Sequence, residues 1–194
     1  MTTIEEEIIA DFELFDDSKH KEKLQNALKQ SKFSKPYENT TVHFDVKPFP
    51  YQNEVLEKLE VERTVHNRYR NLVVAATGTG KTVISAFDYK RFKKNNESSK
   101  LLFLAHRKEI LQKSLSTFQG VLKNNNIGEL WVDGLVPDNF EYVFASVQTV
   151  NNQLDTSNIS ADYYDYIIID ECHHQKAKSY RSILNYFKPK ILLG

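Results

Sequence analysis

From residue 50 to the end of the sequence, short apolar runs alternate with longer segments of helical periodicity. The runs at 101–105, 166–169 and 191–193 hold no charged residue and are rich in Leu and Ile. Such runs are typical of strands buried on both faces, as in a parallel sheet. Apolar side chains recur at helical spacing in 52–63, 83–94, 107–122 and 180–187. The alternation predicts an α/β fold with a doubly wound, mostly parallel sheet flanked by helices.

Three weaker apolar segments extend the predicted sheet. The β-branched run at 72–74 is expected to be the first central strand, and 130–132 and 142–145 to be short strands. Residues 151–161 are polar and predict a loop. These assignments complete the strand and helix alternation of a single domain.

The N-terminal residues follow a different pattern. Residues 4–33 carry two apolar stripes at helical spacing, and 34–50 contain three prolines among β-forming residues. We therefore expect a small helical appendage and linker over 1–45 and the α/β domain over 46–194. The appendage is either a helical pair packed on the α/β core or the edge of a domain from a longer protein.

Charge and cysteine content add weaker constraints. The 194 residues hold 26 basic and 26 acidic side chains, and residues 1–33 carry eight acidic against five basic ones. The slight basic excess that this leaves in the rest of the chain falls well short of a nucleic-acid-binding stripe. The single cysteine, Cys172, excludes an internal disulfide, and no secretory leader or membrane-spanning run is apparent. We expect a cytoplasmic protein without membrane contact.

Residues 75–82 carry the strongest chemical pattern. They match the phosphate-binding motif G-x-x-x-x-G-K-[ST] except that Ala75 replaces the first Gly, and they lie between an apolar run and a predicted helix. In such a loop, backbone N–H groups and the helix N-terminus point at phosphate oxygens. The residues predicted to bind the nucleotide here are Thr77, Gly78, Thr79, Gly80, Lys81 and Thr82, with Lys81 on the β- and γ-phosphates and Thr82 on Mg²⁺. A glycine-rich turn before an ordinary helix is the alternative.

Two acidic residues follow the buried run at 166–169. Because parallel strands end at the same sheet edge, Asp170 and Glu171 are expected to meet the phosphate loop. Asp170 would hold Mg²⁺, and Glu171 would polarise the water that attacks the γ-phosphate. Zinc binding by Cys172, His173 and His174 is disfavoured, because three consecutive residues do not readily converge on one tetrahedral ion.

These motifs together resemble a known family. Asp170-Glu171-Cys172-His173 is similar to the D-E-x-H box of superfamily 2 helicases and translocases, and residues 75–82 to their phosphate loop. The segments Pro50-Tyr51-Gln52, Leu104-Ala105-His106-Arg107 and Ser146-Val147-Gln148-Thr149 resemble further motifs in the expected order. The resemblance covers most of residues 48–194. It is greatest to the first RecA-like domain of the branch that contains type III restriction-enzyme motors and the excision-repair helicase.

The resemblance implies ATP as the nucleotide and assigns roles to single residues. Gln52 would read adenine, with a buried helix-capping glutamine as the alternative. Arg107, Gln148 and Thr149 would contact a nucleic-acid backbone, DNA rather than RNA, with solvated surface residues as the alternative. His173 would couple the ATP site to a second RecA-like domain, and His174 would line the cleft between the domains. Lys81 and Glu171 would carry the catalysis.

Two departures from the family pattern stand out. Phe49 occupies a position where many relatives carry a basic residue, and the sequence stops at Gly194, where relatives continue into a T-A-T-P motif and a second RecA-like domain. We expect the first motor domain of an ATP-dependent DNA helicase or translocase, cut from a longer chain and nearly inactive by itself. The alternatives are a small-molecule phosphate-loop NTPase or kinase, and a nucleotide-gated binding module that does not hydrolyse.

Overall fold

The computed structural model describes residues 46–194 except 77, 155, 157 and 171–176, and these belong to one compact unit, His43–Gly194. Its helices are α3 (Pro50–Thr64), α4 (Lys81–Asn95), α5 (Lys108–Leu122), α6 (Val147–Gln153) and α7 (Ala177–Tyr186). Its strands are β1 (Arg70–Asn71), β2 (Leu101–Ala105), β3 (Glu129–Trp131), β4 (Tyr142–Ser146), β5 (Tyr166–Ile169) and β6 (Ile191–Leu193). The appendage predicted for residues 1–45 lies outside the described residues, and the domain boundary at 45 and 46 stays a prediction.

The six strands form one sheet in the order β1-β6-β5-β2-β4-β3, and every pair is parallel. The middle strands β2 and β5 are in register from Leu101 opposite Tyr166 to Leu104 opposite Ile169. All strands therefore end at the same edge of the sheet. This carboxyl edge is where an open α/β sheet binds ligands.

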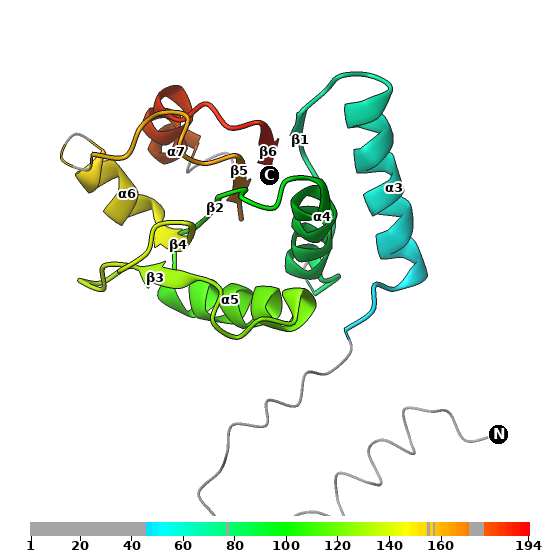
Figure 1. Ribbon diagram of the computed structural model, residues 1–194, viewed down its shortest axis with the longest axis horizontal. Helices are drawn as coiled ribbons and strands as arrows, with labels where there is room; N and C mark the ends of the chain where they lie inside the picture. The colour runs from blue at the N-terminus through cyan, green and yellow to red at the C-terminus, as the bar shows by residue number, and fades with distance from the viewer. Residues whose placement is uncertain (1–45, 77, 155, 157, 171–176) are drawn as a thin grey trace, which may run out of the picture. The chain divides into compact units, whose positions relative to one another are not determined.

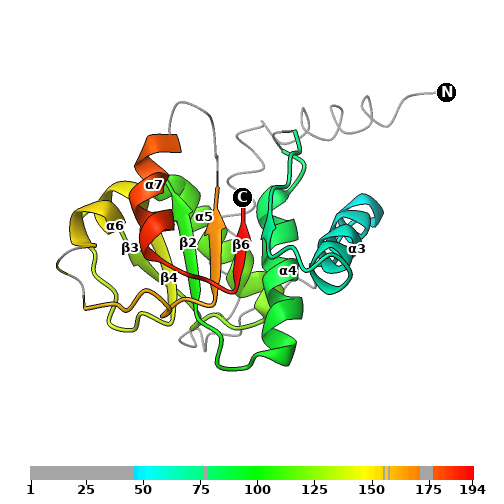
Figure 2. The ribbon, with the colours of Figure 1, turned by 90° about the horizontal axis from the view of Figure 1, so that it is seen from above.

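Helices cover both faces of the sheet (Figures 1 and 2). One face packs on α3, α4 and α5 around Phe103, Phe118 and Phe144, and the other packs on α6 and α7 around Leu104, Ile167 and Tyr180. Because neighbouring strand residues point to opposite faces, the continuous apolar runs at β2 and β5 supply both layers at once. The predicted doubly wound fold is confirmed.

Most predicted elements are present, and two predictions were wrong. The run at 72–74 is not a central strand: β1 ends at Asn71, lies at the edge of the sheet, and leaves Leu72 and Val74 68% and 88% exposed. The residues of this run carry strand propensity, but only Val73 makes a further ladder-like bond, its N–H donating to the Gly194 carbonyl at 2.7 Å. The loop predicted for 151–161 begins later than expected, because residues 151–153 are the end of helix α6, whose N-terminus is capped by the Ser146 hydroxyl accepting from the Thr149 N–H at 3.0 Å.

Trp131 is buried at 5% exposure and packs edge-on against Phe140, so it belongs to the core. In the described part of the chain, no helix is both long and apolar enough to cross a bilayer.

Candidate nucleotide-binding site

The carboxyl edge of the sheet brings the predicted chemistry together. The phosphate loop follows β1, Asp170 follows β5, Arg107 follows β2, and Gln148 follows β4. Adjacent strands lie about 4.8 Å apart, so the two ladder steps from β1 to β5 place the loop and Asp170 on strands roughly 10 Å apart. Arg107 and Gln148 follow strands one and two steps beyond β5. The predicted nucleotide-binding residues therefore lie toward one end of this edge, and the predicted nucleic-acid residues lie toward the other.

The phosphate loop owes its shape to two glycines and one threonine. Gly78 and Gly80 adopt left-handed backbone angles, with φ of +85° and +74°, and glycine reaches this region at little cost. Between them, the Thr79 hydroxyl donates to the Ala76 carbonyl at 2.7 Å and closes a turn. Gly80 is the N-cap of α4 and accepts its first helical bond from the Ile84 N–H at 3.0 Å. The helix N-terminus therefore faces the loop with its unpaired N–H groups, as an anion site requires.

Lys81 reaches back across the loop. Its ammonium donates to the Ala75 carbonyl at 3.2 Å, which spans the loop from its last residues to its first. An ammonium carries three donors, so this bond leaves capacity for phosphate oxygens. Thr82 follows on the first turn of α4 and is half-buried. The glycines, the ammonium and the hydroxyl fit a polyphosphate with its metal ion.

Gln52 joins helix α3 to the loop. It is 2% exposed, its Oε1 accepts from the Phe49 N–H at 2.9 Å, and its Nε2 donates to the Thr79 carbonyl at 3.2 Å. The side chain therefore caps the N-terminus of α3. The adenine contact remains a prediction. Its formation would replace the bond that Gln52 Nε2 donates to the Tyr51 hydroxyl, which at 3.3 Å is the longest hydrogen bond of this amide.

Tyr51 is a site residue for which the sequence motif indicated no role. Its hydroxyl donates to the Thr79 carbonyl at 2.7 Å, so two neighbouring side chains hold the same loop carbonyl. Phe49, at the position of the family's basic residue, is 61% exposed and stacks on Tyr51 with ring centroids 6.0 Å apart. The site therefore has an aromatic surface at this position and no cationic side chain.

Asp170 is held through its backbone at the end of β5. Its N–H donates to the Leu104 carbonyl at 2.9 Å, and its own carbonyl accepts from the Tyr180 hydroxyl at 3.1 Å. These bonds fix the point where the chain leaves the sheet. Thr77, Glu171, His173 and His174 lie outside the described residues, and their predicted roles stay predictions.

The three predicted nucleic-acid residues occupy neighbouring strand ends. Arg107 is the exposed N-cap of α5, and Gln148 is exposed on the first turn of α6. Gln148 Nε2 lies 3.4 Å from Nδ1 of His106, the residue before Arg107, so the two motifs meet. Thr149 is committed to the cap of α6, with its hydroxyl 2.8 Å from that of Ser146. Its contact with a nucleic acid stays a prediction.

The chain is similar in sequence to known proteins. Residues 45–194 match the family described as type III restriction enzyme, res subunit. The chain is 34% identical over 125 residues to the putative ATP-dependent helicase IRC3 of Saccharomyces cerevisiae, a match that covers 60% of this chain and 17% of that protein. It is 29% identical over 160 residues to the type I restriction enzyme EcoAI endonuclease subunit of Escherichia coli, covering 76% of this chain and 19% of the relative.

Two solved structures share the fold. The UvsW helicase from bacteriophage T4 superimposes with a TM-score of 0.60 at 21% identity, covering 77% of this chain and 52% of that chain. A nuclease-deletion mutant of the type ISP restriction-modification enzyme LlaGI, in complex with a DNA substrate mimic, gives a TM-score of 0.56 at 17% identity. That match covers 76% of this chain and 17% of that chain. The chain spans less than a fifth of the two relatives matched by sequence.

The family match covers more than half of the chain and takes in the phosphate loop, the carboxyl edge and all six strands. It decides against a small-molecule kinase, because the relatives are a putative ATP-dependent helicase and a type I restriction enzyme endonuclease subunit. The chain therefore belongs to the family of the type III restriction enzyme res subunit, as an ATP-binding RecA-like domain of the helicase class.

Proposed function

We propose that this domain hydrolyses ATP as one half of a DNA helicase or translocase whose full-length chain moves on nucleic acid. The observation that carries the proposal is the shared carboxyl edge, where the phosphate loop and Asp170 adjoin the strand ends that bear Arg107 and Gln148. The names of the relatives support an ATP-dependent motor, and the DNA substrate mimic bound to the LlaGI neighbour supports DNA as its track.

In this proposal the residues of the edge divide the work. Lys81 and the N–H groups of the loop bind the phosphates, and Gln52 selects adenine. Thr82 and Asp170 would hold Mg²⁺, since hydroxyl and carboxylate oxygens are its preferred ligands. Bound Mg²⁺ supplies positive charge to the phosphate oxygens. Glu171 orients the attacking water and accepts its proton.

The second partner in this proposal is another RecA-like domain of the full-length chain, which His173 and His174 would face. An arginine from such a domain contributes on the order of 10³–10⁵ to the rate in related NTPases. Arg107 and Gln148 would contact DNA phosphates, which give affinity without reading sequence. Binding to DNA should therefore weaken steeply as salt rises.

The test measures ATP binding and phosphate release in parallel, with the full-length protein and with the 194 residues. Lys81→Ala should weaken ATP binding at least about tenfold, because it removes a hydrogen bond between charged groups. Glu171→Gln should keep binding and lose turnover, since it preserves shape and removes the base. The matched control is Lys94→Ala, which removes an exposed lysine from the last turn of the same helix and should change neither quantity.

The 194 residues by themselves should bind ATP and release phosphate at least about 10³-fold more slowly than the full-length protein. Unchanged ATP affinity in Lys81→Ala would remove the loop from the site. Full turnover by the 194 residues, stimulated by single-stranded DNA, would contradict the division of the site between two domains.

A further inference from the structure

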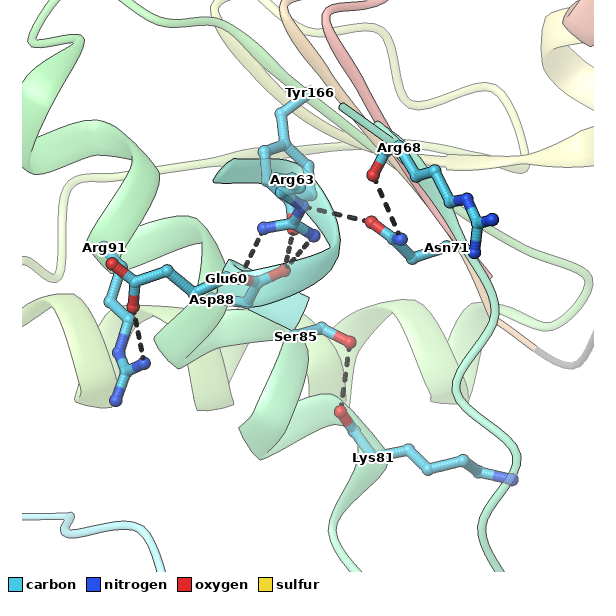
Figure 3. A network of polar contacts seen from close by, with 9 residues as sticks. All are labelled: Glu60, Arg63, Arg68, Asn71, Lys81, Ser85, Asp88, Arg91 and Tyr166. Atoms are coloured by element: carbon cyan, nitrogen blue, oxygen red, sulfur yellow. Dashed lines mark hydrogen bonds and ion pairs between the residues drawn. The ribbon is translucent and has the colours of Figure 1, made fainter. Parts of the chain in front are cut away.

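A buried ion pair joins helices α3 and α4 away from the phosphate loop (Figure 3). The Arg63 guanidinium donates from Nη1 and Nη2 to the two carboxylate oxygens of Asp88, both at 2.7 Å. The two residues are 8% and 3% exposed. The fork-to-fork geometry allows one relative placement of the two side chains.

Two further residues complete this arrangement, which we call the Arg63 cluster: Arg63, Asp88, Asn71 and Tyr166. Arg63 Nε donates to Asn71 Oδ1 at 3.1 Å, and the Tyr166 hydroxyl donates to Asp88. Asn71 in turn donates from Nδ2 to the Arg68 carbonyl at 3.2 Å. The cluster therefore contacts four elements, α3, α4, β1 and β5.

Each of these elements carries part of the nucleotide site at a distance from the cluster. Helix α3 begins with the segment that bears Gln52, α4 begins at Lys81, β1 leads into the phosphate loop, and β5 leads into Asp170. Asp88 lies seven residues along α4 from Lys81, or roughly 10 Å. Tyr166 lies four residues along β5 from Asp170, or roughly 13 Å. Secondary-structure elements of this kind are among the structures that carry coupling between sites.

We propose that the Arg63 cluster positions the nucleotide site, by fixing the offsets of α3, α4, β1 and β5 so that Gln52, the phosphate loop and Asp170 meet. This inference rests on the proposed function. None of the four residues belongs to the predicted site, and we assign them no contact with ATP. They act through the elements that bear them.

The chemistry of the cluster favours positioning over simple stabilisation. A buried ion pair loses hydration on burial, and apolar side chains of similar volume are often as stable, so the pair gives specificity of geometry more than stability. Burial acts to lower the pKa of Arg63, but the hydrogen bond to Asp88 and the neighbouring charges outweigh it, so the pKa is raised and the cation persists. Tyr89 and Phe92 of α4 pack edge-on against the Tyr166 ring, with centroids 5.3 and 5.4 Å away, and hold its hydroxyl toward Asp88.

A second ion pair between the same helices provides the matched control. Arg91 of α4 lies 3.3 Å from Glu60 of α3, but their side chains are 41% and 64% exposed. Water screens this pair and permits many geometries, so it should not set the helix offset. A loss of nucleotide binding that follows removal of the buried pair but not removal of the exposed pair is therefore attributed to the fixed geometry of the buried pair.

The experiment compares unfolding by urea with binding of a fluorescent ATP analogue, in the presence of Mg²⁺, for the 194-residue chain. The double variant Arg63→Met/Asp88→Leu removes both charges together, and a cavity of about 510 Å³ beside the pair gives the new side chains room. Because the buried Tyr166 hydroxyl loses its bond to Asp88, we expect the urea midpoint to fall modestly, as in Tyr166→Phe, while the protein still folds. We expect the variant to bind the analogue roughly 2- to 30-fold more weakly. The control Glu60→Gln/Arg91→Met should match the parent in both measurements.

Conservative variants decide the matter if the double variant fails to fold. Arg63→Lys keeps the positive charge but cannot make the two parallel hydrogen bonds to Asp88, and Tyr166→Phe removes only one hydroxyl. Both variants should therefore fold, and both should bind the analogue more weakly. Parental affinity in these two variants, or in a stable double variant, would overturn the inference. A parent that binds no analogue, or binding unchanged in Lys81→Ala, would instead indicate failure of the proposed function.

Discussion

Two glycines of the phosphate loop share a left-handed backbone but differ in their surroundings. A Cβ added to Gly78 would meet nothing within 4 Å, whereas one added to Gly80 would come within 2.6 Å of Gln52 Nε2. The first glycine is needed for its backbone alone. The second also leaves room for the side chain that ties α3 to the loop.

Replacing each glycine by alanine separates these two requirements. Gly78→Ala should lower the free energy of unfolding by about 1–2 kcal/mol, the cost of a left-handed non-glycine residue. Gly80→Ala should cost about 1 kcal/mol more, because Gln52 must move and give up its bond to the Thr79 carbonyl. Urea denaturation in the absence of nucleotide measures both values. An equal decrease in the free energy of unfolding of the two variants would show that Gln52 can move aside without an energetic cost.

Two charged residues lie at positions where the helical patterns of α3 and α4 favour apolar ones. Arg63 continues the buried stripe of Leu56 and Leu59, and Asp88 stands one turn after the buried Ile84. A charged residue at a core position of a helix is rarely buried unless it is paired. The two helical patterns therefore implied partners for both charges. They could not show that the partners were each other.

At the scale of elements, β5 illustrates how burial on both faces makes a strand sensitive to change. Ile167 and Ile168 are 0% and 2% exposed and belong to opposite cores. A strand of a one-sided sheet would alternate between buried and exposed positions. No position within this strand is therefore expected to tolerate a smaller or a polar side chain.

Alanine should accordingly be costly at both neighbouring positions. We expect Ile167→Ala and Ile168→Ala each to lower the free energy of unfolding by about 2–5 kcal/mol, through lost burial and the cavity left behind. Leu72→Ala, at a residue that is 68% exposed, should change it by less than about 0.5 kcal/mol. Chemical denaturation of the three variants provides the comparison. A small effect at either isoleucine would mean that one helical layer repacks independently.

For the molecule as a whole, buried tyrosines connect stability to alkaline pH. Burial raises the pKa of Tyr89, Tyr164 and Tyr166 above the ordinary value of 10.0, and Asp88 raises that of Tyr166 further. Tyr89 and Tyr166 belong to one core layer and Tyr164 to the other. Folding therefore favours the protonated form of these tyrosines in both core layers.

The sign of the pH effect follows from these shifts. Because the folded pKa values exceed the unfolded ones, the contribution to stability is complete below pH 10 and is lost as the pH rises toward the raised values. We expect the helical circular dichroism to be lost in one step above about pH 10, and the phenolate absorbance of the buried tyrosines to appear in the same step. Ionisation of all tyrosines before any loss of helical signal would contradict this.

Tyr164→Phe is the informative variant for this prediction. The Tyr164 hydroxyl is buried without a hydrogen-bond partner among the described residues, so its removal should leave stability at neutral pH unchanged or raised. The same change should move the alkaline transition to higher pH. Tyr166→Phe should instead lower stability at neutral pH, because it removes the bond to Asp88.

The sequence by itself determined the features that contiguous residues encode. Left-handed glycines, a lysine and a threonine define the phosphate loop within residues 78–82, and the buried runs of β2, β5 and β6 have the bounds that their composition predicts. Parallel strands share a carboxyl edge, so the same patterns also predicted that Asp170 follows a strand ending at the edge that bears the loop. These inferences need only local conformation and one rule of topology.

Only the tertiary structure decided which distant residues meet. Strand propensity at 72–74 could not reveal that β1 lies at the sheet edge, since that depends on its pairing with β6 far along the chain. The bond from Tyr51 to Thr79 joins residues 28 positions apart, and that from Tyr166 to Asp88 joins residues 78 apart. Such contacts arise from the packing of whole helices and strands, because side-chain pairing is set by the distances between elements and no pattern within one element specifies its partner.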